Sequence, residues 1–226
     1  MQHSRIARIS LVVVAGLLVA APAAAQVAGK LEVGISGMLG VGDEGKVDGS
    51  AGGVQVSQKD DLDPSGGFGI HALYTVLPFL DGGGLDLGGR VAFLWWQAED
   101  AVAPGVPIAD HGTLIDISLM AKPRMRFLDD RLEVYLKVPL GLTISVLEDL
   151  PNVTKGRTGA GVNFGVLPGV SWTFAQHWVL FLDLGYALHW MRHEGESKAN
   201  PLFTVSGTQE YTAHEFAMNL GLAYRF

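Results

Sequence analysis

The chain of 226 residues contains no cysteine. This absence excludes a disulfide framework, a thiolate metal site and a lipid anchor attached to cysteine. Basic residues are also in the minority, with 16 Lys and Arg against 23 Asp and Glu and a net charge of −7. An acidic surface argues against nucleic acid as a partner.

Long hydrophobic runs are missing too. A permanent transmembrane helix needs about 20 consecutive apolar residues, and no segment of the chain reaches this length. At the N-terminus, Arg5 and Arg8 precede a short apolar segment, residues 11–21, which is followed by proline and three alanines. This arrangement is typical of a cleavable secretory signal peptide, with an uncleaved anchor helix as the alternative. We expect residues 1–25 to be the signal peptide and residues 26–226 to be the mature protein, which is then either soluble or a β-barrel.

The last sixteen residues, 211–226, alternate strictly. Counting back in twos from Phe226, large apolar side chains occupy every position as far as Phe216, and small or polar side chains lie between them. A period of two over this length predicts a β-strand with one apolar and one polar face.

The same alternation recurs along the chain. The eight expected strands cover residues 30–41, 67–77, 85–97, 113–127, 132–146, 160–174, 178–192 and 211–226. Long polar connections, at 42–66, 98–112, 147–159 and 193–210, alternate with short turns. Each strand is long enough for a tilted bilayer crossing, which takes about 9–11 residues.

Aromatic side chains gather near the two ends of these strands. Those near the short turns are Phe79, Phe127, Trp172, Phe174, Trp178, Tyr224 and Phe226, and those near the long connections are Phe68, Trp95, Trp96, Trp190 and Tyr211. Two aromatic rings are the pattern that the two interfaces of a membrane select.

With these strands, these rings and a last strand that stops at Phe226, the chain resembles the small OmpA/OmpX-like outer-membrane β-barrels of Gram-negative bacteria. The resemblance implies an all-β, eight-stranded antiparallel up-and-down transmembrane barrel in the outer membrane, with the short turns and both termini in the periplasm. It also implies a monomer that contacts outer-membrane lipid and lipopolysaccharide. In such proteins a terminal aromatic is part of the signal read by the barrel assembly machinery, a role that falls here to Phe226.

The second face of the strands would point into the barrel, where there is just enough room for side chains. It is rich in glycine and carries ionisable residues of both signs: Glu32, Asp86, Arg90, Asp116, Lys122, Arg124, Glu133, Lys137, Asp183, Glu215 and Arg225. We expect them to pair as a closed plug, with a narrow gated pore or proton path as the alternative. Arg90 with Asp116 and Arg126 with Glu133 are the expected neighbours.

Three prolines, Pro123, Pro139 and Pro168, fall inside expected strands. Proline removes a hydrogen bond from the ladder, and a closed barrel has no edge strand to tolerate it. We therefore expect bulges or local breaks at these positions.

The signals for catalysis are weak. Lipid hydrolysis would need a serine, a histidine and a carboxylate within hydrogen-bond reach, and no G-x-S-x-G motif is present. Of the strand histidines His71, His189 and His214, the last falls on the lipid-facing phase, with Ser206 and Glu210 nearby in sequence. An interfacial or headgroup contact is the preferred interpretation of His214.

Metal binding has equally little support. Asp60, Asp61 and Asp63 could offer oxygens to calcium or to divalent ions that bridge lipopolysaccharide, but the spacing of an EF-hand is absent. A solvated acidic loop is the simpler interpretation, and no cofactor is expected.

The sequence therefore predicts an integral outer-membrane barrel without catalytic activity, with a structural or surface-interaction role in the cell envelope. Three alternatives stay open: a narrow channel for ions or small solutes, a barrel enzyme acting on outer-leaflet lipid, and a soluble ligand-binding barrel.

Overall fold

The computed structural model describes residues 31–51, 54–60, 65–79, 82–97, 102–103, 106–107, 111–147, 153–155, 158–200 and 203–226. The expected signal peptide lies outside these ranges, so its cleavage stays a prediction. Within the described residues, no helix is long and apolar enough to cross a membrane.

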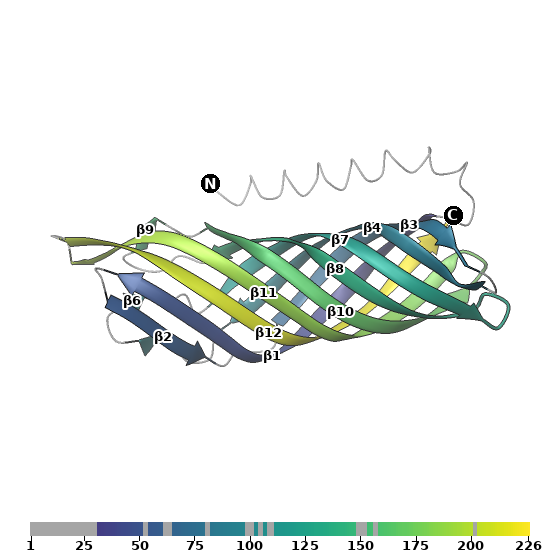
Figure 1. Ribbon diagram of the computed structural model, residues 1–226, viewed down its shortest axis with the longest axis horizontal. Helices are drawn as coiled ribbons and strands as arrows, with labels where there is room; N and C mark the ends of the chain where they lie inside the picture. Colours follow the sequence, from purple (N-terminus) through teal and green to yellow (C-terminus); the bar gives the residue numbers. More distant parts are fainter. Residues whose placement is uncertain are drawn as a thin grey trace.

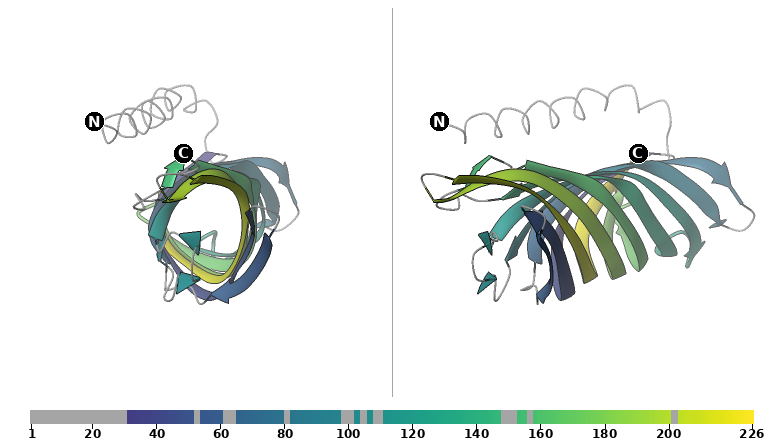
Figure 2. Two further views of the ribbon diagram at one scale, coloured as in Figure 1. Left: turned by 90° about the vertical axis from the view of Figure 1, so that its left-hand side faces the viewer. Right: turned by 60° about the vertical axis from the view of Figure 1, so that its left-hand side comes forward.

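Eight long strands form one closed antiparallel sheet. They are β1 (Leu31–Ala51), β3 (Ser65–Pro78), β4 (Gly84–Gln97), β7 (His111–Phe127), β8 (Leu132–Leu147), β10 (Thr158–Phe174), β11 (Trp178–Asn200) and β12 (Phe203–Arg225). Each pairs with the next in this order, and β12 returns to pair with β1. The view along the barrel shows the resulting ring (Figure 2). The predicted eight-stranded up-and-down barrel is confirmed.

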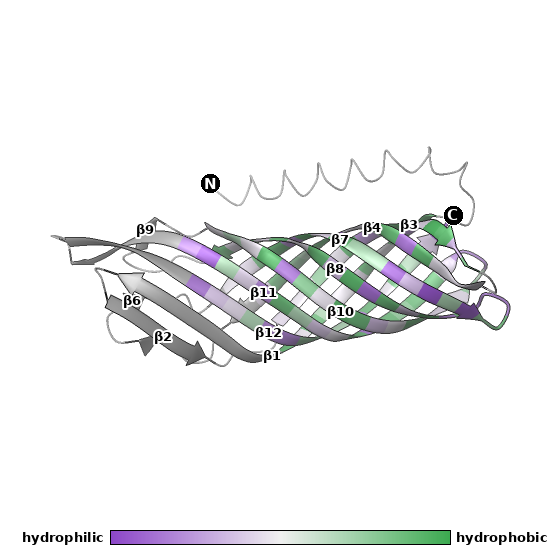
Figure 3. Ribbon diagram, viewed as in Figure 1, coloured by the Kyte–Doolittle hydropathy of each residue, from purple (hydrophilic) through white to green (hydrophobic). Residues whose placement is uncertain are grey.

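The alternation in the sequence determines which side chains point outward. In β12, Phe216 and Leu220 are 50% and 55% exposed, whereas Ala217 and Asn219 between them are 4% and 3% exposed. Hydrophobic and hydrophilic bands therefore follow one another along the strands (Figure 3). The apolar face lies outside and the small or polar face inside, the reverse of a water-soluble β-protein.

The short turns lie at the end of the barrel where the chain terminates (Figure 1). Leu128, Asp129 and Asp130 between β7 and β8, and Ala175 and Gln176 between β10 and β11, all have positive φ angles. Residues other than glycine rarely adopt this conformation, and tight reversals are where it occurs. The predicted tight turns are present at these two places.

The long polar connections contain more strand than we predicted. β1 continues to Ala51 and pairs with β2 (Val54–Asp60), while β11 and β12 form one hairpin as far as Asn200 and Phe203. The remaining short strands are β5 (Val102–Ala103), β6 (Val106–Pro107) and β9 (Val153–Lys155). The prediction of loops at 42–66 and 193–210 is therefore wrong for most of their length. Outside a membrane no bilayer selects one apolar face, so a ladder can continue there without the alternation by which the sequence indicated strands.

The three prolines interrupt the ladders without changing the register. Across Pro123, the pairs Ala121 with Val138 and Arg124 with Tyr135 belong to the same register, so no residue is inserted. Pro139 has no partner in the ladder between β8 and β10, and Pro168 has none in the ladder between β10 and β11, while the register on either side is the same. The expected local breaks occur, and the expected bulges do not occur in these described ladders. Intact pairs on both sides hold the register where one donor is lost.

Glycines on the inner face make room for aromatic rings on the neighbouring strand. Gly169 lies directly opposite Tyr135, and a Cβ on Gly169 would lie 2.5 Å from the Tyr135 Cε2 atom. Gly34 lies directly opposite His71, where a Cβ would lie 2.6 Å from Cε1. The interior is thus filled by large side chains laid across glycine backbone, which explains its high glycine content.

Replacing Gly169 with alanine should lower the free energy of unfolding by about 1–3 kcal/mol, the usual effect of overpacking a filled interior. The added Cβ would also lie 2.6 Å from Asp183 Oδ1, which accepts a hydrogen bond from Tyr135, so this hydrogen-bonded pair would have to shift. The measurement is urea unfolding of the protein folded into lipid vesicles, followed by tryptophan fluorescence.

The matched control is Gly37→Ala. Gly37 faces outward, and the atom nearest to its added Cβ is the Leu220 carbonyl oxygen at 4.0 Å. The free energy of unfolding of the Gly37→Ala variant should equal that of the wild type or be slightly higher. An equal loss in both variants would contradict the role given to the inner glycines.

Candidate functional site

The interior near the short turns contains a cluster of four charged side chains from four strands. Lys122 Nζ lies 2.6 Å from Glu133 Oε1 and 3.0 Å from Glu32 Oε1. Arg225 Nη2 lies 2.6 Å from Glu32 Oε2 and 3.1 Å from Glu133 Oε2. All four residues are buried. Two acids and two bases therefore form a closed ring across β1, β7, β8 and β12, which we call the ionic cluster.

Two further arginines extend the ionic cluster along the wall. Arg126 Nε donates to Glu133 Oε2 at 2.9 Å, so the expected Arg126–Glu133 neighbours are in contact. Arg124 Nε donates to Asp86 Oδ2 at 2.8 Å. Because every carboxylate of this layer has a basic partner, none is an isolated buried charge, which would be costly.

The next layer is built around a lysine between two aromatic rings. Lys137 Nζ donates to Asp183 Oδ2 at 3.0 Å and lies 3.9 Å from the centroid of the Phe181 ring and 5.0 Å from that of Tyr135. The Tyr135 hydroxyl donates to the second Asp183 oxygen. The His71 ring meets Phe181 edge-on. All five side chains of this layer are buried.

A third layer is centred on Asp116. His189 Nε2 lies 2.9 Å from Asp116 Oδ2, and the Thr143 hydroxyl donates to Oδ1 at 2.6 Å. Arg90 Nη2 is 3.7 Å from Asp116, close enough for an ion pair but beyond a hydrogen bond. The expected Arg90–Asp116 proximity is thus present, but the shorter contact of Asp116 is with His189.

Glu215 and an amide complete this third layer. The Ser65 hydroxyl donates to Glu215 Oε2 at 2.9 Å, and Ser118 donates to the Asn163 side-chain oxygen at 2.7 Å. Asn163 in turn donates to Thr143 at 3.1 Å. Hydrogen bonds thus connect most polar groups of this layer, although the buried Arg90 Nε has no hydrogen-bond partner among the described residues.

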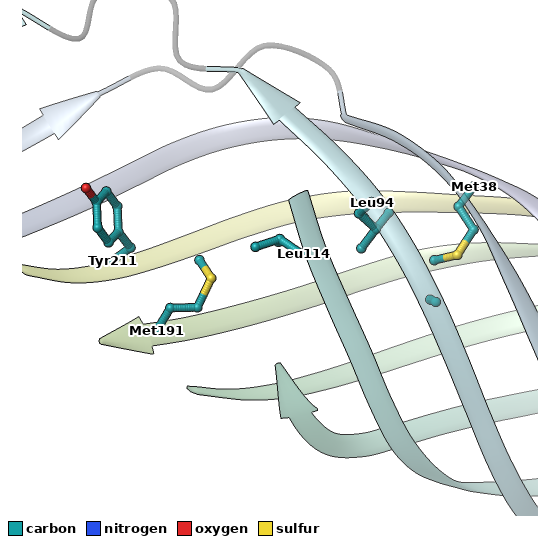
Figure 4. Packing of buried hydrophobic residues seen from close by; sticks show 6 residues of the cluster. Met38, Leu94, Leu114, Met191 and Tyr211 are labelled. Atoms are coloured by element: carbon teal, nitrogen blue, oxygen red, sulfur yellow. The ribbon is translucent and has the colours of Figure 1, made fainter. Parts of the chain in front are cut away.

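Near the long connections the interior contains an apolar cluster, and the buried His193 ring packs edge-on against one of its members, Tyr211. Figure 4 shows this apolar cluster, made of Met38, Ala92, Leu94, Leu114, Met191 and Tyr211. We predicted Tyr211 to belong to the outer aromatic ring, and this is wrong, because its side chain is only 7% exposed. Tyr211 occupies an inner-phase position of β12, so its ring points into the barrel.

The remaining aromatic residues expected in the two rings lie on the outside where their side chains are described. Trp95 and Trp190 near the long connections and Trp172 and Trp178 near the short turns are 40–53% exposed. Tyr224 packs edge-on against Trp178 and Phe226. Trp96 belongs to β4, but its side chain lies outside the described part.

The residues considered for catalysis do not come together. His214 Nδ1 is hydrogen bonded to the Tyr186 hydroxyl, on the outer face. Ser206 lies eight positions before His214 on the continuous strand β12, which separates their backbones by about 27 Å. The geometry of a Ser–His–carboxylate triad is therefore not formed by these residues.

The candidate metal ligands are only partly visible. Asp60 ends β2, and Asp61 and Asp63 lie outside the described residues. Within the described ranges, no group of three or more His, Asp or Glu side chains could hold a metal ion.

Sequence reasoning missed several polar members of these layers, among them Tyr135, His71, His189, Thr143 and Asn163. All fall on inner-phase positions, but alternation alone does not say what they contact. A usable signal was the glycine directly across the ladder from Tyr135 and from His71. A large side chain opposite glycine on the inner face indicates a group that reaches into the lumen.

The fold has known counterparts. No protein-family model matches the sequence, and no curated protein matches it. The solved structure of the outer membrane protein OprG from Pseudomonas aeruginosa superposes with a TM-score of 0.64 at 14% sequence identity, covering 88% of this chain and 96% of OprG. The chain has the fold of an outer-membrane β-barrel.

Other barrels of this fold are less similar in shape. Neisserial surface protein A (NspA) has 17% identity and a TM-score of 0.44, covering 87% of this chain and 97% of NspA. The outer membrane protein AlkL has 17% identity and a TM-score of 0.45, covering 88% of this chain and 90% of AlkL. At these identities the likeness concerns the barrel fold and leaves the role of this particular barrel to its own residues.

Replacing Lys122 with methionine should lower the free energy of unfolding by about 3–5 kcal/mol, because Glu32 and Glu133 would lose one of their two shared basic partners in a buried site. Methionine fills nearly the same space, so the loss would report charge and not volume. Urea unfolding in lipid vesicles measures it.

Arg131→Gln serves as the control for this change, because Arg131 is exposed in the β7–β8 turn. Its unfolding midpoint should stay at the wild-type value. If Lys122→Met were as stable as Arg131→Gln, the ionic cluster would not stabilise the barrel.

Proposed function

We propose that this protein is an integral outer-membrane barrel with a closed lumen and a structural or surface-contact role in the cell envelope. The observation that carries this proposal is the ionic cluster, which joins β1, β7, β8 and β12 across the interior. Neither transport nor catalysis is part of the proposal.

The outer surface supports a membrane location. Large apolar side chains are exposed on all eight strands, and Leu119 is 78% exposed and Leu142 63% exposed. Water-soluble monomers rarely expose contiguous apolar patches beyond a few hundred Å². An apolar layer bordered by aromatic residues at both ends is the surface that lipid requires.

The layers inside the barrel argue against a channel. A solute would first meet the apolar cluster, then the Asp116 layer, then Lys137 between its two rings, and finally the ionic cluster. Opening such a path would separate buried ion pairs, and breaking a single pair of this kind costs about 3–5 kcal/mol. A closed barrel is therefore the state that these contacts favour.

The long connections support a role at the surface. β1, β11 and β12 continue well past Val41, Trp190 and Phe216, which lie on the apolar outer face, and β2 pairs with the extension of β1. The barrel thus presents a projecting sheet at the end opposite the C-terminus and the short turns (Figure 1). Contacts with lipopolysaccharide or with other surfaces would be made by this end.

The membrane assignment is tested by fractionation. We expect the protein in the outer-membrane fraction, and we expect an unboiled sample to migrate faster on a gel than a boiled one, as a detergent-resistant closed barrel does. Recovery in the soluble periplasmic fraction without a gel shift would mean that the faces described as lipid-facing are the core of a soluble protein.

The closed lumen is tested separately by planar-bilayer recordings of the purified mature protein. We expect no reproducible conductance steps at either polarity, with a general porin in the same bilayers as the positive control. Discrete steps that persist at several salt concentrations would overturn the closed-lumen proposal and favour the narrow channel.

A further inference from the structure

One polar pair interrupts the apolar outer surface. The Tyr186 hydroxyl on β11 and His214 Nδ1 on β12 are hydrogen bonded, and their ring centroids are 5.9 Å apart. Tyr186 is 42% exposed and His214 is partly exposed. Between the outer aromatic ring and the short turns, the other outward positions of the described strands carry apolar side chains, glycine or proline. The exceptions are tyrosines near the short turns.

The position of the pair along the strands places it at the edge of the apolar layer. A strand in such a barrel advances about 2.5 Å along the membrane normal per residue, from a rise of about 3.3 Å and a tilt of about 40°. His214 precedes Tyr224 by ten residues, so it lies about 25 Å above the inner aromatic ring. The apolar layer of these barrels is about 25 Å tall, and His214 therefore lies where lipid headgroups begin.

The surroundings of the pair admit a lipid. Phe216 lies directly across the ladder from Tyr186, and Leu188 directly across from His214. Phe216 and Trp190, the next outward residue beyond Leu188, are 50% and 40% exposed. Phe216 is nearer than His214 to the middle of the apolar layer and would face acyl chains, while His214 and Trp190, which lies farther out, would face the headgroup region. A molecule with both parts therefore fits this surface better than a soluble solute does.

The chemistry of the pair favours an anionic headgroup. When the Tyr186 hydroxyl donates to Nδ1, the remaining ring proton of His214 is on Nε2, which then acts as a hydrogen-bond donor. A donor at the edge of an apolar layer is suited to a phosphate oxygen.

We propose that Tyr186 and His214 form a binding site on the barrel wall for a phosphate group of lipid A, the lipid part of lipopolysaccharide. Tyr186 is the positioning residue, because it fixes the ring of His214, and His214 contacts the phosphate. The site rests on the proposed function, since it needs the long connections to lie on the outer-leaflet side. It is a binding site and requires no chemical step.

The test compares lipid A with the same lipid A after enzymatic removal of its phosphates. The folded mature protein is equilibrated with equal amounts of the two in mixed micelles, and the bound lipid is counted by native mass spectrometry. Wild type should prefer the phosphorylated form. His214→Phe should lower this preference about threefold to tenfold, the value of one hydrogen bond to the ligand, and Tyr186→Phe should lower it less.

The matched controls lie at the other end of the barrel. Tyr74 is an outward tyrosine near the short turns, and His177 stacks on Tyr224 there with ring centroids 5.3 Å apart. Tyr74→Phe and His177→Gln should leave the preference for phosphorylated lipid A unchanged. Heat-modifiability on a gel verifies that each variant is folded.

A second measurement uses unaltered protein, so it does not depend on the folding of any variant. The side-chain nitrogen resonances of His214 should shift when lipid A is added and should stay in place with the dephosphorylated form. A wild type without preference, or a preference equal in all variants, would overturn the site, as would an unmoved His214 signal. These results would leave the protein in the membrane fraction, whereas recovery in the soluble fraction would remove both the proposed function and this site.

Discussion

The closure of the sheet between β1 and β12 is the constraint on which the rest of the structure depends. In a bilayer no water is available to unpaired backbone groups, so a spanning sheet must have no edge. The first and last strands meet this requirement by pairing from Glu32 with Arg225 along the wall to Ala51 with Gly207. The backbone of the last residue also takes part, since Phe226 N donates to the Leu31 carbonyl oxygen at 2.9 Å.

Closing eight strands fixes the width of the interior, and the side chains have to fill what remains. The inner face does so with large groups that reach across the axis and glycines that lie beneath them. Tyr135 over Gly169 and His71 over Gly34 are two such combinations. The filling is arranged in layers, from ion pairs near the short turns to an apolar cluster near the long connections. Opening the lumen would therefore break a different kind of contact in each layer.

Alternation in the sequence predicted the strands and the faces, because both follow from a local period of two. It could not predict most of the contacts inside the barrel. Lys122 and Glu32 are 90 positions apart, and they meet only because of the tilt and shear of the closed sheet. The expected partner of Asp116 is an arginine on the adjacent strand, yet its shortest contact with a basic side chain comes from His189 on β11.

The errors have the same origin. The composition of residues 42–51 predicts a loop, but these residues pair with β12. The position of Tyr211 along the chain predicts an interfacial side chain, whereas its phase in the alternation places it inside. In both cases the structure follows strand pairing and side-chain phase, which the barrel imposes, and not the composition or chain position of the residues.

The ionic cluster lies where the barrel closes, so it also helps to determine the register between β1 and β12. Glu32 and Arg225 lie directly opposite each other in the ladder that closes the barrel, and Arg225 Nη2 is 2.6 Å from Glu32 Oε2. Because side chains alternate, a slip of one residue between β1 and β12 would turn every inner residue of one strand toward lipid. Such a slip would turn Arg225 toward lipid and take its guanidinium away from both acids, so that Glu32 would keep only Lys122 of this ring while Glu133 would keep Lys122 and Arg126. Ion pairs add little stability over an apolar filling of the same volume, but here they make the wrong registers of the closing strands costly.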